Sequence, residues 1–185
     1  MLEVILLGIA LAVDALAVSI ANGIKYYNYT KKNMFLASIS FGVFQAVLPL
    51  LGYFVFTPFI KYVDSIDHWI VLILLSYLGI DMIKDSFKKD EEINTQEKFT
   101  FKILMFESVA TAIDALSVGI TLPSLALNPY MSCFIIGLST TVICFIGHAL
   151  GKKIGMLLKN KALLFGGIVL IAIGIKEVLE GLGIL

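Results

Sequence analysis

The sequence predicts an all-α integral membrane protein, with six transmembrane helices arranged as two inverted three-helix repeats. An apolar composition, six long apolar windows and a motif that recurs in the second half of the chain carry this prediction. Of the 185 residues, 59% are hydrophobic and only 15% are charged, and the mean hydropathy is +0.96. Soluble domains are nearer half apolar and a quarter charged, so the composition indicates a membrane protein.

Six windows are long and apolar enough to cross a hydrocarbon core about 30 Å thick, which takes about 20 helical residues. The first window follows the acidic "MLEV" rather than a basic segment, and no small-residue cleavage pattern comes after it. We therefore expect it to remain in the mature protein rather than act as a cleaved signal. The windows cover roughly residues 2–24, 34–58, 69–87, 103–123, 129–150 and 162–183.

The distribution of lysine predicts the orientation of the chain. The sequence contains no arginine, and twelve of its fourteen lysines lie in the connections after the first, third and fifth windows. Because positively charged loops stay in the cytoplasm, we expect both termini to lie outside it. The twelve are Lys25, Lys31, Lys32, Lys84, Lys88, Lys89, Lys98, Lys102, Lys152, Lys153, Lys159 and Lys161.

A nine-residue segment in the first window is repeated in the fourth. "AVDALAVSI" (12–20) and "AIDALSVGI" (112–120) match at six of nine positions, and they place Asp14 and Asp114 in the same frame. A unit with an odd number of spans must be inserted in the opposite direction the second time. The two halves are therefore predicted to be inverted repeats, whose first and fourth helices meet near the midplane of the membrane.

Two further landmarks follow in the same order and divide the chain. Gly52, seven residues after Gln45, is echoed by Gly151, seven residues after Cys144, and "LGIDMIKD" is echoed by "IGIKEVLE". These landmarks predict a first repeat at 1–88, a cytoplasmic linker at 89–99 and a second, inverted repeat at 100–185. The linker belongs to a stretch of mixed charge at 84–102, which is typical of a solvated loop.

The repeated aspartates are costly where the sequence places them. A carboxylate at the centre of a membrane helix costs on the order of 2.5 to 3.5 kcal/mol on insertion scales, so such residues usually face the protein interior and mark an ion or proton path. Each aspartate could instead cap or hydrogen-bond a neighbouring helix. The duplication of Asp14 as Asp114 favours a shared ion site over two structural acids.

Helical spacing predicts which oxygen atoms accompany the aspartates. Five residues at spacings of three and four form one polar stripe along the fourth window, and they are Glu107, Thr111, Asp114, Ser117 and Thr121. On the first window, Ser19 and Asn22 lie in a sector next to that of Asp14. Gln45 in the second window is either a further oxygen ligand or a hydrogen-bonding group between helices, and Asp81 in the third is a deep acid.

These oxygens predict a metal site for a hard or borderline divalent cation such as Mg²⁺, Ca²⁺ or Mn²⁺. The imidazole and thiolate groups that Zn²⁺ and Cu⁺ prefer are nearly missing from the windows. An amino acid or a cationic organic substrate is an alternative, although no intramembrane arginine is present to hold a carboxylate. A remote alternative is an intramembrane aspartyl protease, but neither aspartate follows the Gly-x-Gly pattern of that enzyme class.

The motifs resemble those of the bacterial manganese efflux pump family (MntP), which belongs to the LysE transporter superfamily. The similar segments are "LAVDALAVSIANGI" (11–24), "GVFQAVLPLLG" (42–52), "AIDALSVG" (112–119) and "IAIGIKEVLEGL" (171–182). The resemblance covers essentially the whole chain, and the paired aspartate motifs are its most specific part. An exporter of another metal or of an amino acid in the same superfamily is the alternative.

The resemblance implies export of Mn²⁺ from the cytoplasm, with Asp14 and Asp114 as the residues on which activity depends. Position 45 is often acidic or glutamine in such proteins, and Gln45 fits the neutral form. Glu107 and Asp81 depart from the family pattern, in which these positions are uncharged or basic. They are either local additions to the ion path or signs of a somewhat different substrate.

Export of a divalent cation has to be coupled to an energy source. Moving one positive charge outward costs about 2.3 kcal/mol per 100 mV of inside-negative potential, and a divalent ion costs twice as much. The segment "GHALGKK" lacks the spacing and the Ser or Thr of a phosphate-binding loop. We therefore hypothesise an alternating-access antiport in which Asp14 and Asp114 exchange protons for the metal.

These inferences together describe a multi-pass transporter of the bacterial inner or plasma membrane and not an enzyme. We expect the lipid bilayer, a divalent metal ion and protons as its partners, and no nucleic acid. No cofactor is expected, because Mn²⁺ is the transported substrate. The apolar surfaces allow a homo-oligomer without requiring one.

Overall fold

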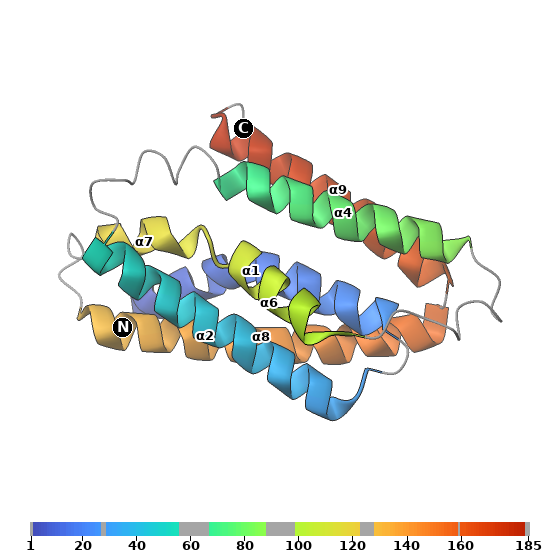
Figure 1. Ribbon diagram of the computed structural model, residues 1–185, viewed down its shortest axis with the longest axis horizontal. Coiled ribbons are helices and arrows are strands. Elements are labelled where there is room, and N and C mark those ends of the chain that lie inside the picture. Colours follow the sequence, from blue (N-terminus) through green and yellow to red (C-terminus); the bar gives the residue numbers. More distant parts are fainter. Residues whose placement is uncertain are drawn as a thin grey trace.

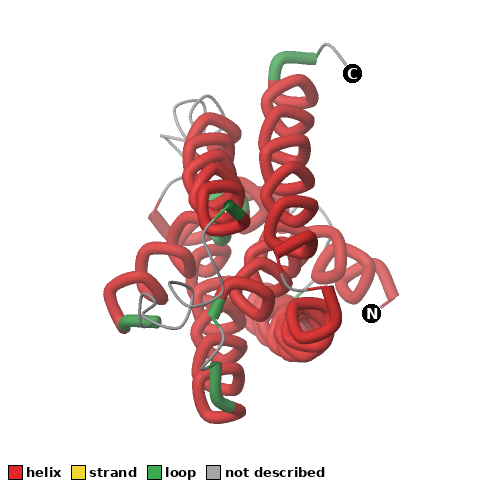
Figure 2. The backbone as a smooth tube through the Cα atoms, turned by 90° about the vertical axis from the view of Figure 1, so that its right-hand side faces the viewer, coloured by secondary structure: helices red, strands yellow, loops and turns green. Residues whose placement is uncertain are grey.

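A computed structural model describes residues 2–26, 29–55, 67–87, 99–122, 128–158 and 160–183 (Figure 1). All regular structure in these ranges is helical, which confirms the predicted all-α class. Figure 2, a view along the long axis, shows the described backbone as helices joined by short loops. The helices are α1 (Leu2–Lys25), α2 (Lys31–Val55), α4 (Asp67–Ser86), α6 (Phe101–Ala110), α7 (Ala115–Thr121), α8 (Pro129–Leu158) and α9 (Asn160–Gly181).

Four of the six predicted spans satisfy the length and composition of a membrane helix within the described residues. They are the segments Val4–Lys25, Lys31–Phe54, Pro129–Leu157 and Lys161–Glu180 of α1, α2, α8 and α9. The third window forms α4, which carries more charged groups, and the fourth window is divided into α6 and α7. The chain is thus a multi-pass helical protein, and the predicted linker at 89–99 lies almost wholly outside the described residues.

The helices form two groups that face each other. Helices α4 and α9 pack along each other as one pair, and α1, α2, α6, α7 and α8 form a second, five-helix group (Figure 1). Within that group α8 packs on both α1 and α2, and α2 also packs on α6 and α7. The α4–α9 pair meets the five-helix group through α1, α6 and α8.

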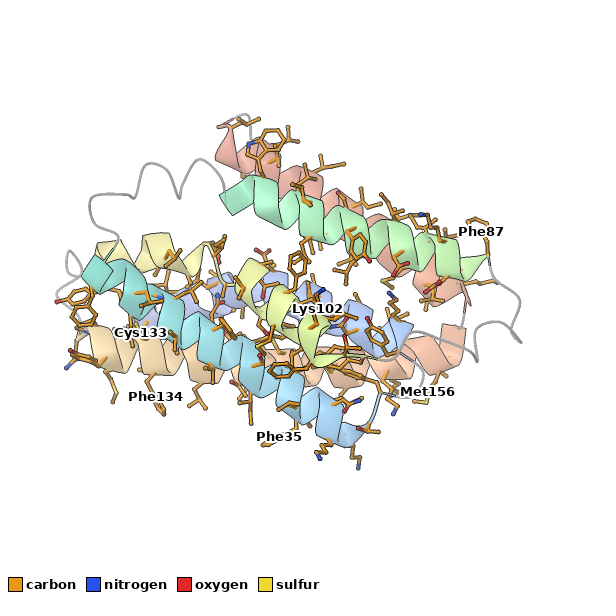
Figure 3. All side chains as sticks on the ribbon, viewed as in Figure 1. Phe35, Phe87, Lys102, Cys133, Phe134 and Met156 are labelled. Atoms are coloured by element: carbon orange, nitrogen blue, oxygen red, sulfur yellow. The ribbon has the colours of Figure 1, made fainter. Side chains whose placement is uncertain are left out.

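The outer surfaces of the long helices are apolar. Phe35 on α2 and Phe134 on α8 are exposed, and their side chains lie at the outside of the bundle (Figure 3). Large exposed hydrophobic side chains also occur along α1, α4 and α9. A soluble monomer rarely exposes so much contiguous apolar surface, whereas lipid-facing helices require it.

Glycines allow the helices of each group to approach closely. A Cβ added at Gly167 would lie 2.5 Å from the carbonyl oxygen of Gly79, and one added at Gly79 would lie 2.6 Å from the carbonyl oxygen of Gly167. On the other side of the molecule, a Cβ at Gly23 would lie 2.5 Å from the carbonyl oxygen of His148. Small residues at such crossings are typical of membrane helix pairs, in which packing replaces hydrophobic collapse.

The fourth window is interrupted at residues 111–114. The Thr111 hydroxyl donates to the Glu107 carbonyl oxygen at 2.8 Å, a type of bond that Ser38 and Thr141 also make within the continuous helices α2 and α8. The next backbone bonds, such as Ala112 N–H to Val109 O, span three residues and tighten the turn. At the equivalent place in the first window, around Leu11, α1 continues without a break.

Substitution of Gly167 tests the packing of α4 on α9. We expect Gly167→Val to lower the melting temperature of the detergent-solubilised protein, because overpacking a close helix crossing costs about 1 to 3 kcal/mol. Ala172→Val is the matched control, since Ala172 is an exposed residue of the same helix. Equal melting temperatures for the two variants would contradict the close approach.

Candidate metal site

Asp14 and Asp114 occupy equivalent sequence positions but different local structures. Asp14 lies inside the continuous helix α1, and its residue is 8% exposed. Asp114 precedes α7, and its side-chain oxygen accepts a hydrogen bond from Ala115 N–H at 2.9 Å. Both aspartates also interact with other groups around them. The first aspartate is thus a helix-interior acid, and the second is a capping acid beside a helix break.

Two predicted ligands from opposite halves of the chain lie in direct contact. The Asn22 side-chain nitrogen donates to a carboxylate oxygen of Glu107 at 2.7 Å, which joins α1 to α6. Asn22 is fully buried, and Glu107 is only 2% exposed. A buried carboxylate needs such donors, because hydrocarbon offers it no water.

Three predicted ligands carry a buried side-chain oxygen that has no hydrogen-bond partner within the described residues. These atoms are Ser19 Oγ, Asn22 Oδ1 and Gln45 Oε1. The Gln45 amide nitrogen donates to the Leu11 carbonyl oxygen at 2.9 Å, which places this side chain beside the turn of α1 that precedes Asp14. Buried oxygens that lack a proton donor are suited to a cation.

The stripe predicted along the fourth window is only partly described. The Thr111 hydroxyl donates within its own helix to the Glu107 carbonyl oxygen. The side chains of Ser117 and Thr121 lie outside the described part of the structure. Glu107 and Asp114 stand on the two sides of the helix break, seven residues apart, so the break separates the two acids of the stripe.

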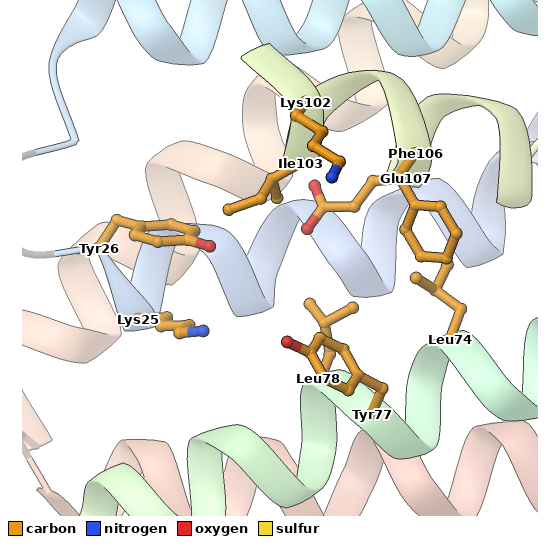
Figure 4. A pocket seen from close by; sticks show the side chains of 9 residues that line it. All are labelled: Lys25, Tyr26, Leu74, Tyr77, Leu78, Lys102, Ile103, Phe106 and Glu107. Atoms are coloured by element: carbon orange, nitrogen blue, oxygen red, sulfur yellow. The ribbon is translucent and has the colours of Figure 1, made fainter. Parts of the chain in front are cut away.

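A cavity of about 260 Å³ lies between α1, α4 and α6 (Figure 4). Its lining combines the carboxylate of Glu107 with the ammonium groups of Lys25 and Lys102. Lys25 forms an ion pair with Asp81 of α4, and the Lys25 side chain is 7% exposed. We refer to this space as the charged cavity; it is also lined by Tyr26, Leu74, Tyr77, Leu78, Ile103 and Phe106.

Tyr29 adds a neutral polar group near the same end of α1. Its hydroxyl is buried without a hydrogen-bond partner in the described residues. Burial, and next the negative charge of Glu107, raise the pKa of the Tyr29 hydroxyl well above its usual range. The tyrosine therefore stays protonated and adds no negative charge beside Glu107.

The arrangement offers oxygen ligands rather than a cluster of strong metal ligands. Among the described residues, no group of three or more His, Cys, Asp or Glu side chains lies close enough to hold a metal ion. A cation bound here would combine one or two carboxylates with neutral amide, hydroxyl and carbonyl oxygens. Weak, oxygen-based coordination of this kind suits an ion that has to leave again.

The sequence reasoning missed two polar features. The sequence analysis used Lys25 only to predict the orientation of the chain. The acid Asp81 within the third window was a signal that a basic partner should lie nearby. Thr140 on α8 has a buried Oγ1 without a hydrogen-bond partner in the described part of the chain, and no motif in the sequence marks it. His148 on the same helix hydrogen-bonds with the Ser19 carbonyl oxygen at 2.9 Å, which fits a structural role.

Comparison with known proteins places this chain among membrane transporters. The family model described as "Putative manganese efflux pump" matches residues 28–178. A protein of Campylobacter fetus named "Putative manganese efflux pump MntP" is 39% identical over 181 residues, which cover 98% of this chain and 99% of that protein. No solved structure matches the chain.

Other relatives with the same kind of name match over their full length. The Campylobacter jejuni protein is 41% identical over 180 residues, covering 97% of this chain and 96% of its own. A Clostridium botulinum protein named "Putative manganese efflux pump MntP 2" is 40% identical over 195 residues, covering 100% and 97% of the two chains. With the paired aspartate motifs and the helical, lipid-facing fold, these matches show that the chain belongs to the MntP family.

Proposed function

We propose that this protein exports Mn²⁺ from the bacterial cytoplasm across the cell membrane. The observation that carries the proposal is the repeated aspartate in the first and fourth windows, accompanied by buried oxygens of Ser19, Asn22 and Gln45 that lack hydrogen-bond partners within the described residues. The names of the relatives point to the same ion. In this proposal Asp14 and Asp114 hold the ion, and Mn²⁺ is the transported substrate rather than a resident cofactor.

The register of two helices supports a site shared by the two aspartates. Helices α1 and α6 run in opposite directions (Figure 1), and Asn22 lies opposite Glu107. Asp14 lies eight residues before Asn22, and Asp114 lies seven residues after Glu107. Because α1 and α6 are antiparallel, these two steps lead in the same direction, and both acids lie at a similar level of the bundle. The step along the continuous helix α1 is about 12 Å at 1.5 Å per residue.

The packing of the two halves supports the proposed inverted repeats at 1–88 and 100–185. Helix α4 packs on its counterpart α9 and α2 on its counterpart α8, while α1 packs on α8 as α6 and α7 pack on α2. Individual contacts recur as well. A Cβ added at Gly119 would overlap with the Pro49 carbonyl oxygen, and at the corresponding positions His148 hydrogen-bonds with the Ser19 carbonyl oxygen. With α4 and the α6–α7 segment counted as spans, the chain crosses the membrane six times.

The positions of the helix ends support the proposed orientation. The C-terminal ends of α1, α4 and α8 lie at one end of the molecule in Figure 1, and these ends precede the lysine-rich connections. By the positive-inside rule this end faces the cytoplasm, and both termini lie outside it. Lys25 and the charged cavity then lie toward the cytoplasm, and Asp14 lies deeper in the membrane.

An alternating-access antiport fits the two-group architecture. In this mechanism the α4–α9 pair would move against the five-helix group, which it meets through α1, α6 and α8. An ion held by Asp14 and Asp114 would then face one side of the membrane at a time. The break at 111–114 resembles the discontinuous helices from which transporters build ion sites. Protons arriving from outside would displace the metal, and Gln45, Thr111 and Ser117 would add neutral oxygens along the path.

Neutralising either aspartate tests the ion site. We expect Asp14→Asn and Asp114→Asn each to lower the rate of Mn²⁺ export by at least about tenfold, equivalent to about 1.4 kcal/mol of lost stabilisation. The measurement is growth and cellular manganese content in cells that lack manganese export, at equal protein levels in the membrane. Glu180→Gln is the control, because Glu180 is an exposed carboxylate near the end of α9. Protection of cells by all three variants would remove the proposed site.

Proton coupling is tested in proteoliposomes loaded with a manganese-sensitive dye. We expect net Mn²⁺ transport against an opposing membrane potential to stop when an ionophore collapses the proton gradient, because each charge costs about 2.3 kcal/mol per 100 mV. Vesicles containing the Asp14→Asn variant supply the background rate. Transport at an unchanged rate without a proton gradient would show that another energy source drives export.

A further inference from the structure

The charged cavity reaches the outer surface of the bundle. Two of its lining residues, Tyr77 of α4 and Phe106 of α6, are 66% and 58% exposed, and Lys102 is exposed as well. Two others, Leu74 and Leu78 of α4, are buried and close the cavity on its inner side. Because the outer surface of these helices faces lipid, membrane lipid is the medium that meets the opening of the cavity.

The lining changes from charged to apolar along the helices. Lys25 is the last residue of α1 and Lys102 is the second of α6, and the ring centroids of Tyr26 and Phe99 beside them are 5.3 Å apart, so these two helix ends meet. Leu74 lies about 10 Å deeper along α4 than the acid that pairs with Lys25, at 1.5 Å per residue. A phospholipid has the same order of groups, with a charged headgroup at the interface and acyl chains toward the middle of the membrane.

Two charged groups of the lining have no ion-pair partner within the described residues. The Lys25 ammonium is paired with Asp81, whereas neither Lys102 nor Glu107 takes part in an ion pair in this part of the chain. The Asn22 amide donates to one carboxylate oxygen of Glu107 at 2.7 Å, and no described group donates to the other oxygen. The cavity therefore presents one positive and one negative group that a ligand can pair.

This combination of charges selects among phospholipid headgroups. The side chains of Lys102 and Glu107 both reach from α6 toward the cavity (Figure 4). Phosphoethanolamine carries a phosphate and a primary ammonium only two carbons apart, so it can pair with both. The quaternary ammonium of choline has no N–H to donate, and a glycerol headgroup has no positive charge to place beside the carboxylate.

We propose that the charged cavity binds a phospholipid with an ethanolamine headgroup. The Lys102 ammonium binds the phosphate, the Glu107 carboxylate accepts hydrogen bonds from the lipid ammonium, and the acyl chains pass Tyr77 and Phe106 into the surrounding bilayer. The bound lipid would contact both the α4–α9 pair and the five-helix group, since residues of α1, α4 and α6 line the cavity. The proposal rests on the membrane location of the chain and not on the exported ion.

Lipid retention by the purified full-length protein tests this site. The probes are phosphatidylethanolamine, phosphatidylcholine and phosphatidylglycerol with identical acyl chains, added to the protein in detergent, and bound lipid is measured by native mass spectrometry. We expect the wild type to bind phosphatidylethanolamine at least about tenfold more tightly than either of the other lipids, because only its headgroup forms charge-assisted hydrogen bonds with Glu107 while its phosphate binds Lys102.

Two variants separate recognition of the ammonium from binding of the phosphate. We expect Glu107→Gln to reduce the preference for ethanolamine to within about threefold, and Lys102→Met to weaken binding of all three lipids by about fivefold. Glu180→Gln and Lys84→Met are the matched controls, since both residues are exposed and lie outside the cavity, and they should leave binding unchanged. A misfolded protein would not lose its preference among headgroups while it still binds all three lipids.

Three results would overturn the proposal: a wild type that binds phosphatidylcholine or phosphatidylglycerol as tightly as phosphatidylethanolamine, an unchanged preference in Glu107→Gln, or a Lys102→Met variant that binds like Lys84→Met. The assay contains no manganese. A protein that fails to export Mn²⁺ while it still selects the ethanolamine lipid would therefore refute the proposed function and leave the lipid site in place.

Discussion

The structure depends on the cost of keeping a charge or a polar backbone group away from water. Three acids meet that cost through different partners: the buried Glu107 through the Asn22 amide, and the half-buried Asp81 and Asp114 through the Lys25 ammonium and the N–H of Ala115. All three partners lie within the bundle, where lipid cannot compete. Two of these contacts join different helices: Asn22–Glu107 links α1 to α6, and Lys25–Asp81 links α1 to α4.

Close helix packing makes these polar contacts reachable. The Gly79–Gly167 crossing brings the backbones of α4 and α9 together, and Gly23 does the same for α1 and α8. Side chains as short as asparagine can then span the gap between helices, as Asn22 does toward Glu107. The Lys25–Asp81 ion pair lies at the boundary between the α4–α9 pair and the five-helix group.

The two halves show how a repeated sequence can yield different structures. Around the repeated aspartates the halves share most residues, yet α1 is continuous and the fourth window breaks at 111–114. Asp114 then caps the helix that follows, a role that Asp14 does not have.

By itself the sequence determined the helical membrane class, the repeated aspartates and the oxygen-rich character of the site, because hydropathy and helical period depend only on the order of residues. It also indicated Asn22, Glu107 and Gln45 as candidates, although not as neighbours. Only the tertiary structure decided that Asn22 contacts Glu107, that Lys25 forms an ion pair with Asp81, and that the fourth window is interrupted. Periodicity assigns a residue to a face of its own helix, whereas the partner across that face depends on how all the helices pack together.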